Sequence, residues 1–160
     1  MNRALRRFIL AVVASSLVLW AIPVSAEVTN LSGTWKLDVE KSNFGKRPKW
    51  KNGTLQVEHK EPSLKYSLTG TQADGKPLKI EFSGAIDGKE YPVVGSPYAS
   101  KVSITRVNHS TTKAVATSAD GKTVETSTLT VSKDGKKLMR KGTVKGPDGE
   151  FKNHALYEKQ

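Results

Sequence analysis

Few residues of this 160-residue chain have the types and spacing that catalysis or metal binding requires. The three histidines, His59, His109 and His154, lie far apart, and none has a second histidine two or four residues away, as a preformed zinc site would need. Cysteine is absent, which excludes thiol nucleophiles, thiolate metal ligands and dithiol redox chemistry. The sequence therefore predicts no metal site.

Catalytic motifs are also absent from the sequence. It contains no Gly-x-Ser-x-Gly elbow, no His-Glu-x-x-His pair and no phosphate-binding glycine loop. Asp-Gly pairs begin at positions 74, 87, 120, 134 and 148, but the further acidic positions and the final Glu of a calcium loop do not follow them. We expect a protein that is not an enzyme, with no catalytic residue and no cofactor.

The residues that could bind a ligand share one phase of an alternating pattern, the phase that would face the inside of a sheet. Small side chains recur in this phase near the middle of the expected strands: Gly70, Gly84, Ala114, Ala116, Ser127, Gly142 and Ala155. Opposed small side chains leave space that a filled core would not tolerate. Polar residues of the same phase are His59, Tyr66, Arg106, Glu125, Arg140, Asn153 and Tyr157.

A mostly apolar cavity with a few convergent polar groups is the usual small-molecule site. The candidate ligand-binding residues are Tyr66, Phe82, Arg106, Ala116, Glu125, Arg140 and Tyr157. The apolar body of the ligand is expected among Leu68, Phe82, Ile104, Ala116, Leu129 and Ala155, with its polar end near Tyr66, Arg106 or Arg140. In the alternative, some of these residues lie at strand ends in contact with solvent, or Glu125 forms a buried ion pair with an arginine.

The chain is basic, with 26 Lys and Arg against 15 Asp and Glu and a formal charge of +11. Most lysines fall on outward positions of different strands or directly after turns, which spreads the charge over the surface. One local concentration, Lys46, Arg47, Lys49 and Lys51, surrounds Trp50 in the polar segment 41–52, where we expect a loop or a short helical turn. This basic loop patch allows an alternative function, binding of an anionic envelope component or a partner protein. We expect no specific nucleic-acid partner.

Turn residues in the sequence mark the ends of the expected strands that position these residues. Asp-Gly tolerates the positive φ angles of tight hairpins, and together with the clusters at 95–97 and 108–110 it gives a turn about every 13 residues. Between the turns, apolar and polar residues alternate with a period of two, as in Trp35, Leu37 and Val39. So many hairpin-linked strands avoid exposed edges by closing. We predict an all-β, antiparallel up-and-down meander of about eight to ten strands closed into a barrel, with a sandwich as the alternative.

The first 26 residues have the pattern of a secretory signal peptide. Arg3, Arg6 and Arg7 precede an apolar run over 8–22, and Val24-Ser25-Ala26 supplies a cleavage site. The run is shorter than the ~20 residues that span a bilayer. Cleavage after Ala26 removes three arginines and no acidic residue, so the charge falls from +11 to +8. We expect residues 27–160 to form a single domain, a monomer without a membrane span, in the periplasm or outside the cell.

The segment Gly33-Thr34-Trp35-Lys36-Leu37, at the start of the first mature strand, resembles the Gly-x-Trp opening of lipocalins and their relatives. Together with Lys41-Ser42-x-Phe44, the run from Asp87 to Pro97 and the closing Tyr157-Glu158-Lys159, it is similar to a family of small secreted bacterial proteins with a lipocalin-like barrel and no assigned function. The resemblance implies that Trp35 plugs one end of the barrel under a late basic side chain, either Arg140 or Lys159.

The same resemblance bears on the ligand. Fatty-acid-binding relatives hold a carboxylate with an Arg-x-Tyr pair on the last strand, whereas here Ala155 precedes Tyr157 at the arginine position. That clamp is therefore not expected. The sequence as a whole indicates an exported, non-enzymatic barrel that binds a small apolar or amphiphilic ligand inside. The alternative is a filled barrel that acts through its basic surface.

Overall fold

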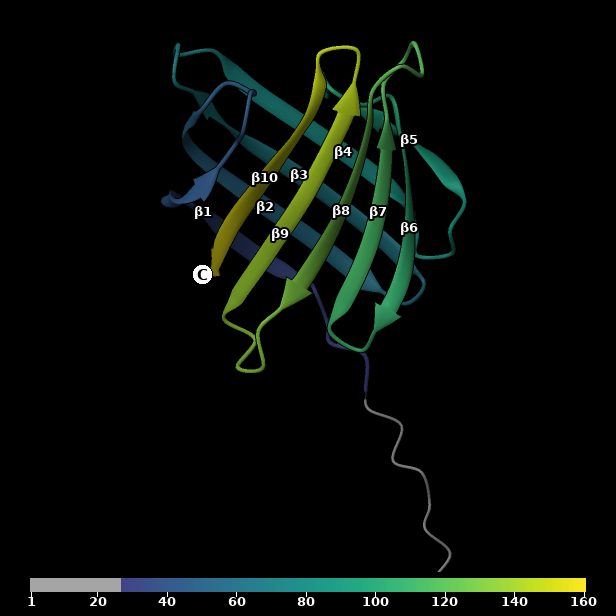
Figure 1. Cartoon of the computed structure of the whole chain (residues 1–160). Coiled ribbons are helices and arrows are strands. Elements are labelled where there is room, and N and C mark those ends of the chain that lie inside the picture. Colours follow the sequence, from purple (N-terminus) through teal and green to yellow (C-terminus); the bar gives the residue numbers. More distant parts are fainter. Residues whose placement is uncertain (1–26) are drawn as a thin grey trace, which may run out of the picture.

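The computed structural model describes residues 27–160, which form ten strands and contain no helix. The strands are β1 (Gly33–Asn43), β2 (Trp50–Lys60), β3 (Ser63–Gln72), β4 (Pro77–Ala85), β5 (Glu90–Val94), β6 (Lys101–Asn108), β7 (Thr111–Thr117), β8 (Val124–Val131), β9 (Lys137–Gly146) and β10 (Gly149–Lys159). Each pairs antiparallel with its sequence neighbours, and β1 also pairs with β10, which closes the barrel (Figure 1). The predicted all-β up-and-down barrel is confirmed. The signal-peptide prediction falls on 1–26, outside the described residues.

The connections gather at two ends of the barrel because successive strands run in opposite directions. One end, here called the mouth, carries segments 44–49, 73–76, 95–100, 118–123 and 147–148. The other end, called the base, carries the N-terminal segment 27–32 and connections 61–62, 86–89, 109–110 and 132–136. The mouth is at the top of Figure 1 and the base at the bottom. Within residues 27–160 no helix is long and apolar enough to cross a membrane.

Trp35 closes the base of the barrel. Its side chain is fully buried, and its indole Nε1 donates a hydrogen bond of 3.0 Å to the carbonyl of Leu31. The ammonium of Lys159 lies 5.2 Å from the centre of the indole ring, within the range of a cation–π contact. A Cβ added at Gly33 would lie 2.9 Å from Cε of Lys159, so glycine leaves room for this cover. Of the two cations that the sequence left open, Lys159 covers Trp35.

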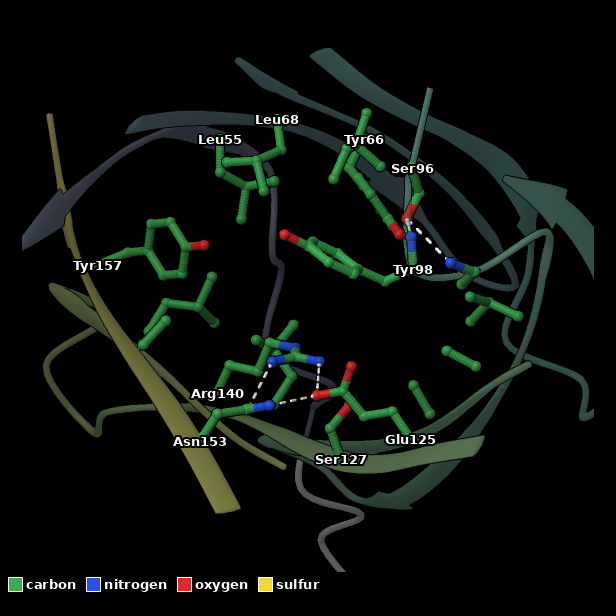
Figure 2. Close-up of a pocket in the computed structure, with 18 of the residues that line it drawn as sticks. Leu55, Tyr66, Leu68, Ser96, Tyr98, Glu125, Ser127, Arg140, Asn153 and Tyr157 are labelled. Carbon is green, nitrogen blue, oxygen red and sulfur yellow. Dashed lines mark hydrogen bonds and ion pairs between the residues drawn. The ribbon is translucent and has the colours of Figure 1, made fainter. Parts of the chain in front are cut away.

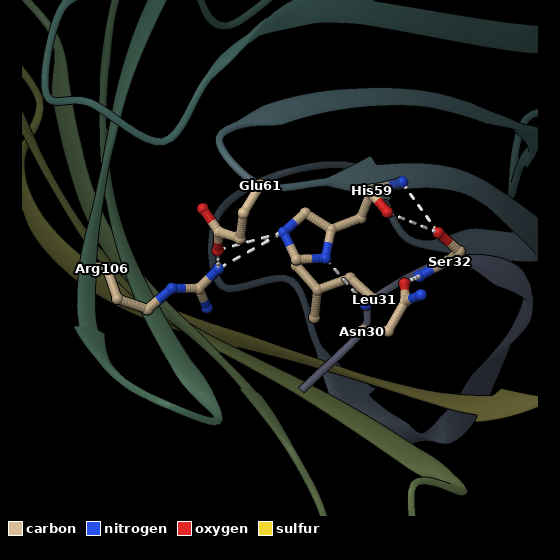
Figure 3. Close-up of polar contacts among 6 residues, drawn as sticks. All are labelled: Asn30, Leu31, Ser32, His59, Glu61 and Arg106. Carbon is tan, nitrogen blue, oxygen red and sulfur yellow. Dashed lines mark hydrogen bonds and ion pairs between the residues drawn. The ribbon is translucent and has the colours of Figure 1, made fainter. Parts of the chain in front are cut away.

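A polar cluster holds the N-terminal segment against the same end (Figure 3). The backbone N–H of Leu31 donates to Nδ1 of His59 at 3.2 Å, and the His59 N–H donates to Ser32 Oγ at 2.8 Å. Because Nδ1 accepts a hydrogen bond, the ring proton lies on Nε2, 3.2 Å from a carboxylate oxygen of Glu61. The guanidinium of Arg106 pairs with the same carboxylate. His59 therefore has a structural role at the base.

The segment 41–52 is more regular than its polar sequence suggested. β1 continues to Asn43 and β2 begins at Trp50, so the connection shortens to 44–49 and contains no helical turn. β1 stays beside β10 through a bulge between Asp38 and Asn43, where the Leu156 N–H donates to Ser42 Oγ at 3.0 Å. The side-chain hydroxyl thus replaces a backbone acceptor where the strand ladder is interrupted.

Candidate functional site

The barrel encloses a cavity of about 240 Å³ (Figure 2), and Phe44, Arg47 and Tyr98 from the mouth connections are among its lining residues. Its walls are mainly apolar. Leu55 and Leu68 lie on β2 and β3, and Glu125, Arg140 and Asn153 lie on the opposite side, on β8, β9 and β10. Alternation puts both sets on inward positions of their strands. The cavity therefore has an apolar wall facing a polar one.

Glu125 is the centre of the polar wall. Its side chain is 6% exposed, and its two carboxylate oxygens accept three hydrogen bonds. Arg140 Nη2 at 2.5 Å and Asn153 Nδ2 at 2.9 Å donate to Oε1, and Arg47 Nη1 at 2.8 Å donates to Oε2. Arg140 Nη1 also donates to Asn153 Oδ1 at 3.0 Å. Burial alone would raise the pKa of Glu125, but the two guanidinium groups and the Asn153 amide outweigh it and hold that pKa below 4.5.

Arg47 and Tyr98 meet at the mouth. Arg47 comes from the β1–β2 connection, and its guanidinium carbon lies 4.3 Å from the centre of the Tyr98 ring, which comes from the β5–β6 connection. Ser96 Oγ accepts hydrogen bonds of 3.2 Å from the N–H groups of Tyr98 and Ala99, which fixes the turn that carries the ring. The cation–π contact joins the β1–β2 and β5–β6 connections at the mouth. The ion pair of Arg47 with Glu125 ties the first of these connections to β8.

Three phenols line the cavity, those of Tyr66, Tyr98 and Tyr157. Within the described part of the chain, no hydrogen bond joins any of the three hydroxyls to another residue. Burial raises the pKa of Tyr66 to about 12, although the charge of Arg140 acts in the opposite direction. Burial raises the pKa of Tyr157 as well, again against the effect of Arg140. Both phenols are therefore neutral at pH 7 and can donate hydrogen bonds to a ligand.

The structure brings together five of the seven candidate ligand-binding residues. Tyr66, Ala116, Glu125, Arg140 and Tyr157 all line the cavity.

Phe82 and Arg106 do not line the cavity, and for these two the prediction was wrong. Phe82 is buried in a row of rings, stacked on Tyr66 at 5.1 Å and edge-on to Tyr91 at 6.3 Å. Arg106 lies at the base with Glu61.

The expectation that inward glycines create the cavity was also wrong for three positions. A Cβ at Gly84 would lie 2.6 Å from Cγ of Tyr91, and one at Gly142 would lie 2.5 Å from Oε1 of Glu125. A Cβ at Gly70 would lie 2.8 Å from Cζ3 of Trp50. These glycines make room for neighbouring large side chains. The small inward residues that do line the cavity are Ala114, Ala116, Ser127 and Ala155.

The four residues of the basic loop patch do not share one surface. Arg47 points into the barrel, and Lys46 reaches across the mouth, where its ammonium donates to the carbonyl of Asp148 at 2.8 Å. Lys49 and Lys51 are exposed, the first just before β2 and the second within it. Sequence spacing predicted a cluster because it could not show that Glu125, 78 positions later, pairs with Arg47.

Sequence reasoning missed the part of the site that the connections supply. Ser96 and Tyr98 line the cavity but lie in the β5–β6 connection, outside the alternating pattern. Tyr98 did give one signal, since it is a large aromatic residue directly after the turn residues Ser96 and Pro97. Among residues 27–160, no group of three or more histidine, aspartate or glutamate side chains is placed to hold a metal ion.

Comparisons with known proteins assign the chain to no family. No protein-family model matches the chain. No curated protein matches its sequence. Among solved structures, the chain is similar to a redesigned β-barrel, mFAP1, bound to DFHBI, with a TM-score of 0.41 and 16% identity over 81% of this chain and 94% of that chain. The site must therefore be interpreted from its own geometry.

Proposed function

We propose that this protein is an exported, non-enzymatic binding protein whose barrel holds a small amphiphilic molecule. The observation that carries the proposal is the cavity of about 240 Å³, in which an apolar wall faces the polar wall of Glu125, Arg140 and Asn153 and the phenols of Tyr66 and Tyr157 also line the space. Ligand pockets are usually about 300–1,000 Å³, mainly apolar, with few polar groups. A cavity just below that range suits a compact ligand of one or two rings better than a long acyl chain.

The charged groups of the polar wall are not needed to stabilise the barrel core. An apolar barrel interior needs no charged groups. Among residues 27–160, the hydroxyls of Tyr66 and Tyr157 are not among the fully buried polar atoms that lack a partner, so they face open space in the cavity. A ligand in that space can accept hydrogen bonds from both. The alternative function, recognition of a polyanion by the basic loop patch, has less support because Arg47 pairs with Glu125 inside the barrel and Lys46 bonds to the Asp148 carbonyl across the mouth.

Export and a lipocalin-like assignment complete the proposal. The signal-peptide pattern at 1–26 supports export to the periplasm or beyond. The Gly33-x-Trp35 opening, with Lys159 over the indole, supports the lipocalin-like assignment. Mass spectrometry of the mature protein should find Glu27 as its first residue, and a chain that retains residues 1–26 would contradict export with cleavage.

Native mass spectrometry of protein purified from its own host tests the ligand directly. We expect a bound small molecule that is lost on denaturation. The matched control is the variant Ala116→Leu, which fills part of the wall and should purify without the molecule. A wild-type mass equal to that of the bare chain, together with no binding of small aromatic probes, would refute the proposal.

A further inference from the structure

We propose that the cavity selects a small aromatic or branched monoanion, such as a carboxylate, over neutral and cationic molecules of the same shape. This inference rests on the proposed function and deepens it by naming the chemical class of the ligand. Two independent features of the wall carry it, the net charge and the supply of hydrogen-bond donors.

The charge of the wall is the first feature. Among residues 27–160, three charged side chains line the cavity: Arg47, Glu125 and Arg140. Glu125 can neutralise only one of the two arginines, so the cluster keeps one positive charge. The apolar surroundings screen that charge less than water does. One negative charge on the ligand balances it, whereas a cation would raise the charge to two.

The donors are the second feature. Glu125 already accepts three hydrogen bonds, which leaves little capacity for a donor on the ligand. Arg140 has five N–H groups, and only two of them are used, by Glu125 and Asn153. Its side chain is 30% exposed although it lies on the cavity wall, so part of the guanidinium faces open space.

The phenols point to the same class of ligand. Tyr157 directs its hydroxyl toward the middle of the cavity (Figure 2), and Tyr66 lines the same space. Free N–H groups of Arg140 and two phenol O–H groups together offer donors to one acceptor-rich group. A carboxylate fits this arrangement because hydrogen bonds to a charged acceptor are about twice as strong as neutral ones. An amide matches its shape without the charge.

Three probes with the same ring system separate charge from shape: 2-naphthoate, 2-naphthamide and 2-naphthylmethylamine. Isothermal titration calorimetry at pH 7, with quenching of the cavity residue Trp50 as a second signal, measures each Kd. We expect naphthoate to bind at least about tenfold more tightly than the amide, which corresponds to about 1.4 kcal/mol. The amine should bind most weakly.

Substitutions then test whether the preference for naphthoate arises from the cluster of Arg47, Glu125 and Arg140. Arg140→Gln should reduce the preference for naphthoate over the amide to within about threefold, and Arg140→Lys should keep part of it. Glu125→Gln should increase it, because the cluster gains a positive charge. The matched control is Lys113→Gln, which removes the same charge from the outer surface and should leave the preference unchanged. Thermal unfolding checks that each variant remains folded. If Arg140→Gln does not fold, Arg47→Gln replaces it, because it also leaves one arginine against Glu125 and so removes the net charge of the cluster.

Each outcome bears on a different claim. Equal affinity for naphthoate and naphthamide, or tightest binding of the amine, would overturn the monoanion inference and leave the proposed function intact. If no probe binds but native mass spectrometry retains a small molecule, the charge of that molecule decides: an anion supports the inference and a neutral or cationic molecule overturns it. If no probe binds and nothing co-purifies, the proposed function and this inference fail together.

Discussion

Replacement of Glu125 by Gln tests the cluster at the centre of the site. The change keeps the shape of the side chain and removes its charge, so Arg47 and Arg140 lose their common partner. Breaking a fully buried ion pair by removal of one partner is destabilising by about 3–5 kcal/mol. Here Arg47 and Arg140 are 18% and 30% exposed, so water screens part of the stranded charge. We expect a loss of about 2–3 kcal/mol in the free energy of unfolding.

The dependence on pH separates a charge effect from a packing effect. Because the folded pKa of Glu125 lies below 4.5, the carboxylate stabilises the fold fully above its unfolded pKa. That contribution is lost as the pH falls through the lower folded pKa. Gln does not titrate, and the other carboxylates are common to both proteins. The difference between wild type and variant should therefore be full at about pH 7 and small at about pH 3.

Urea unfolding of residues 27–160, followed by circular dichroism at both pH values, measures this difference. Glu81→Gln is the matched control because Glu81 forms an exposed pair with Lys79, 49% and 60% exposed, and its loss should change stability by less than about 0.5 kcal/mol. A Glu125→Gln variant as stable as the wild type at pH 7 would refute the ion cluster. A loss of the same size at both pH values would show that packing, not charge, is responsible.

Five further substitutions test the fold and the cavity by thermal or urea unfolding, and one of them, Ala116→Leu, is also tested by naphthoate binding. Trp35→Ala should lower the free energy of unfolding by about 3–5 kcal/mol through the cavity it leaves, and a melting temperature within a few degrees of wild type would exclude Trp35 as the plug of the base. Gly95→Ala should destabilise by about 3 kcal/mol or more and Gly121→Ala by about 1 kcal/mol. Both glycines have φ near +75° (+77° and +73°), but only a Cβ at Gly95 would collide with the Lys79 carbonyl, so equal losses would contradict that approach. Ala116→Leu should weaken naphthoate binding more than tenfold with a stability loss under about 1 kcal/mol, whereas Gly84→Leu should destabilise by about 1–3 kcal/mol or more. A strong loss of stability in Ala116→Leu would mean that the space beside Ala116 is already filled.

The fold could be predicted from the sequence because its signals are local. Asp-Gly turns and a period of two specify the strands, and short connections between neighbours leave a meander that closes. The inward phase of Tyr66, Glu125, Arg140 and Tyr157 followed from the same alternation. A period of two identifies the face of the sheet on which a side chain lies. For these residues, the inward face was enough to predict that they line the cavity.

Alternation could not give the height of a side chain along the barrel or the neighbours that it meets. Arg106 and Arg140 share the inward phase, yet Arg106 pairs with Glu61 at the base and Arg140 with Glu125 in the cavity. Height depends on the register of every strand pair around the barrel, which no single strand encodes. The sequence did not place Arg47 and Tyr98 in the cavity for a related reason, although it named Arg47 in the basic loop patch. Both lie in connections, where no period applies and where only the folded mouth brings them together.

The energetics of Glu125 support our proposal that the polar wall serves binding. Apolar residues of similar volume often replace a buried ion pair with no loss of stability, or with a gain. Leucine, valine and isoleucine side chains form much of the rest of the cavity lining, so an apolar alternative to the cluster would fit the interior. Arg140 nevertheless keeps unused donors facing open space, and Arg47 reaches across the mouth to the same carboxylate. A cluster built only to stabilise the barrel would use its donors within the protein. The arrangement observed here leaves them directed at whatever enters through the mouth.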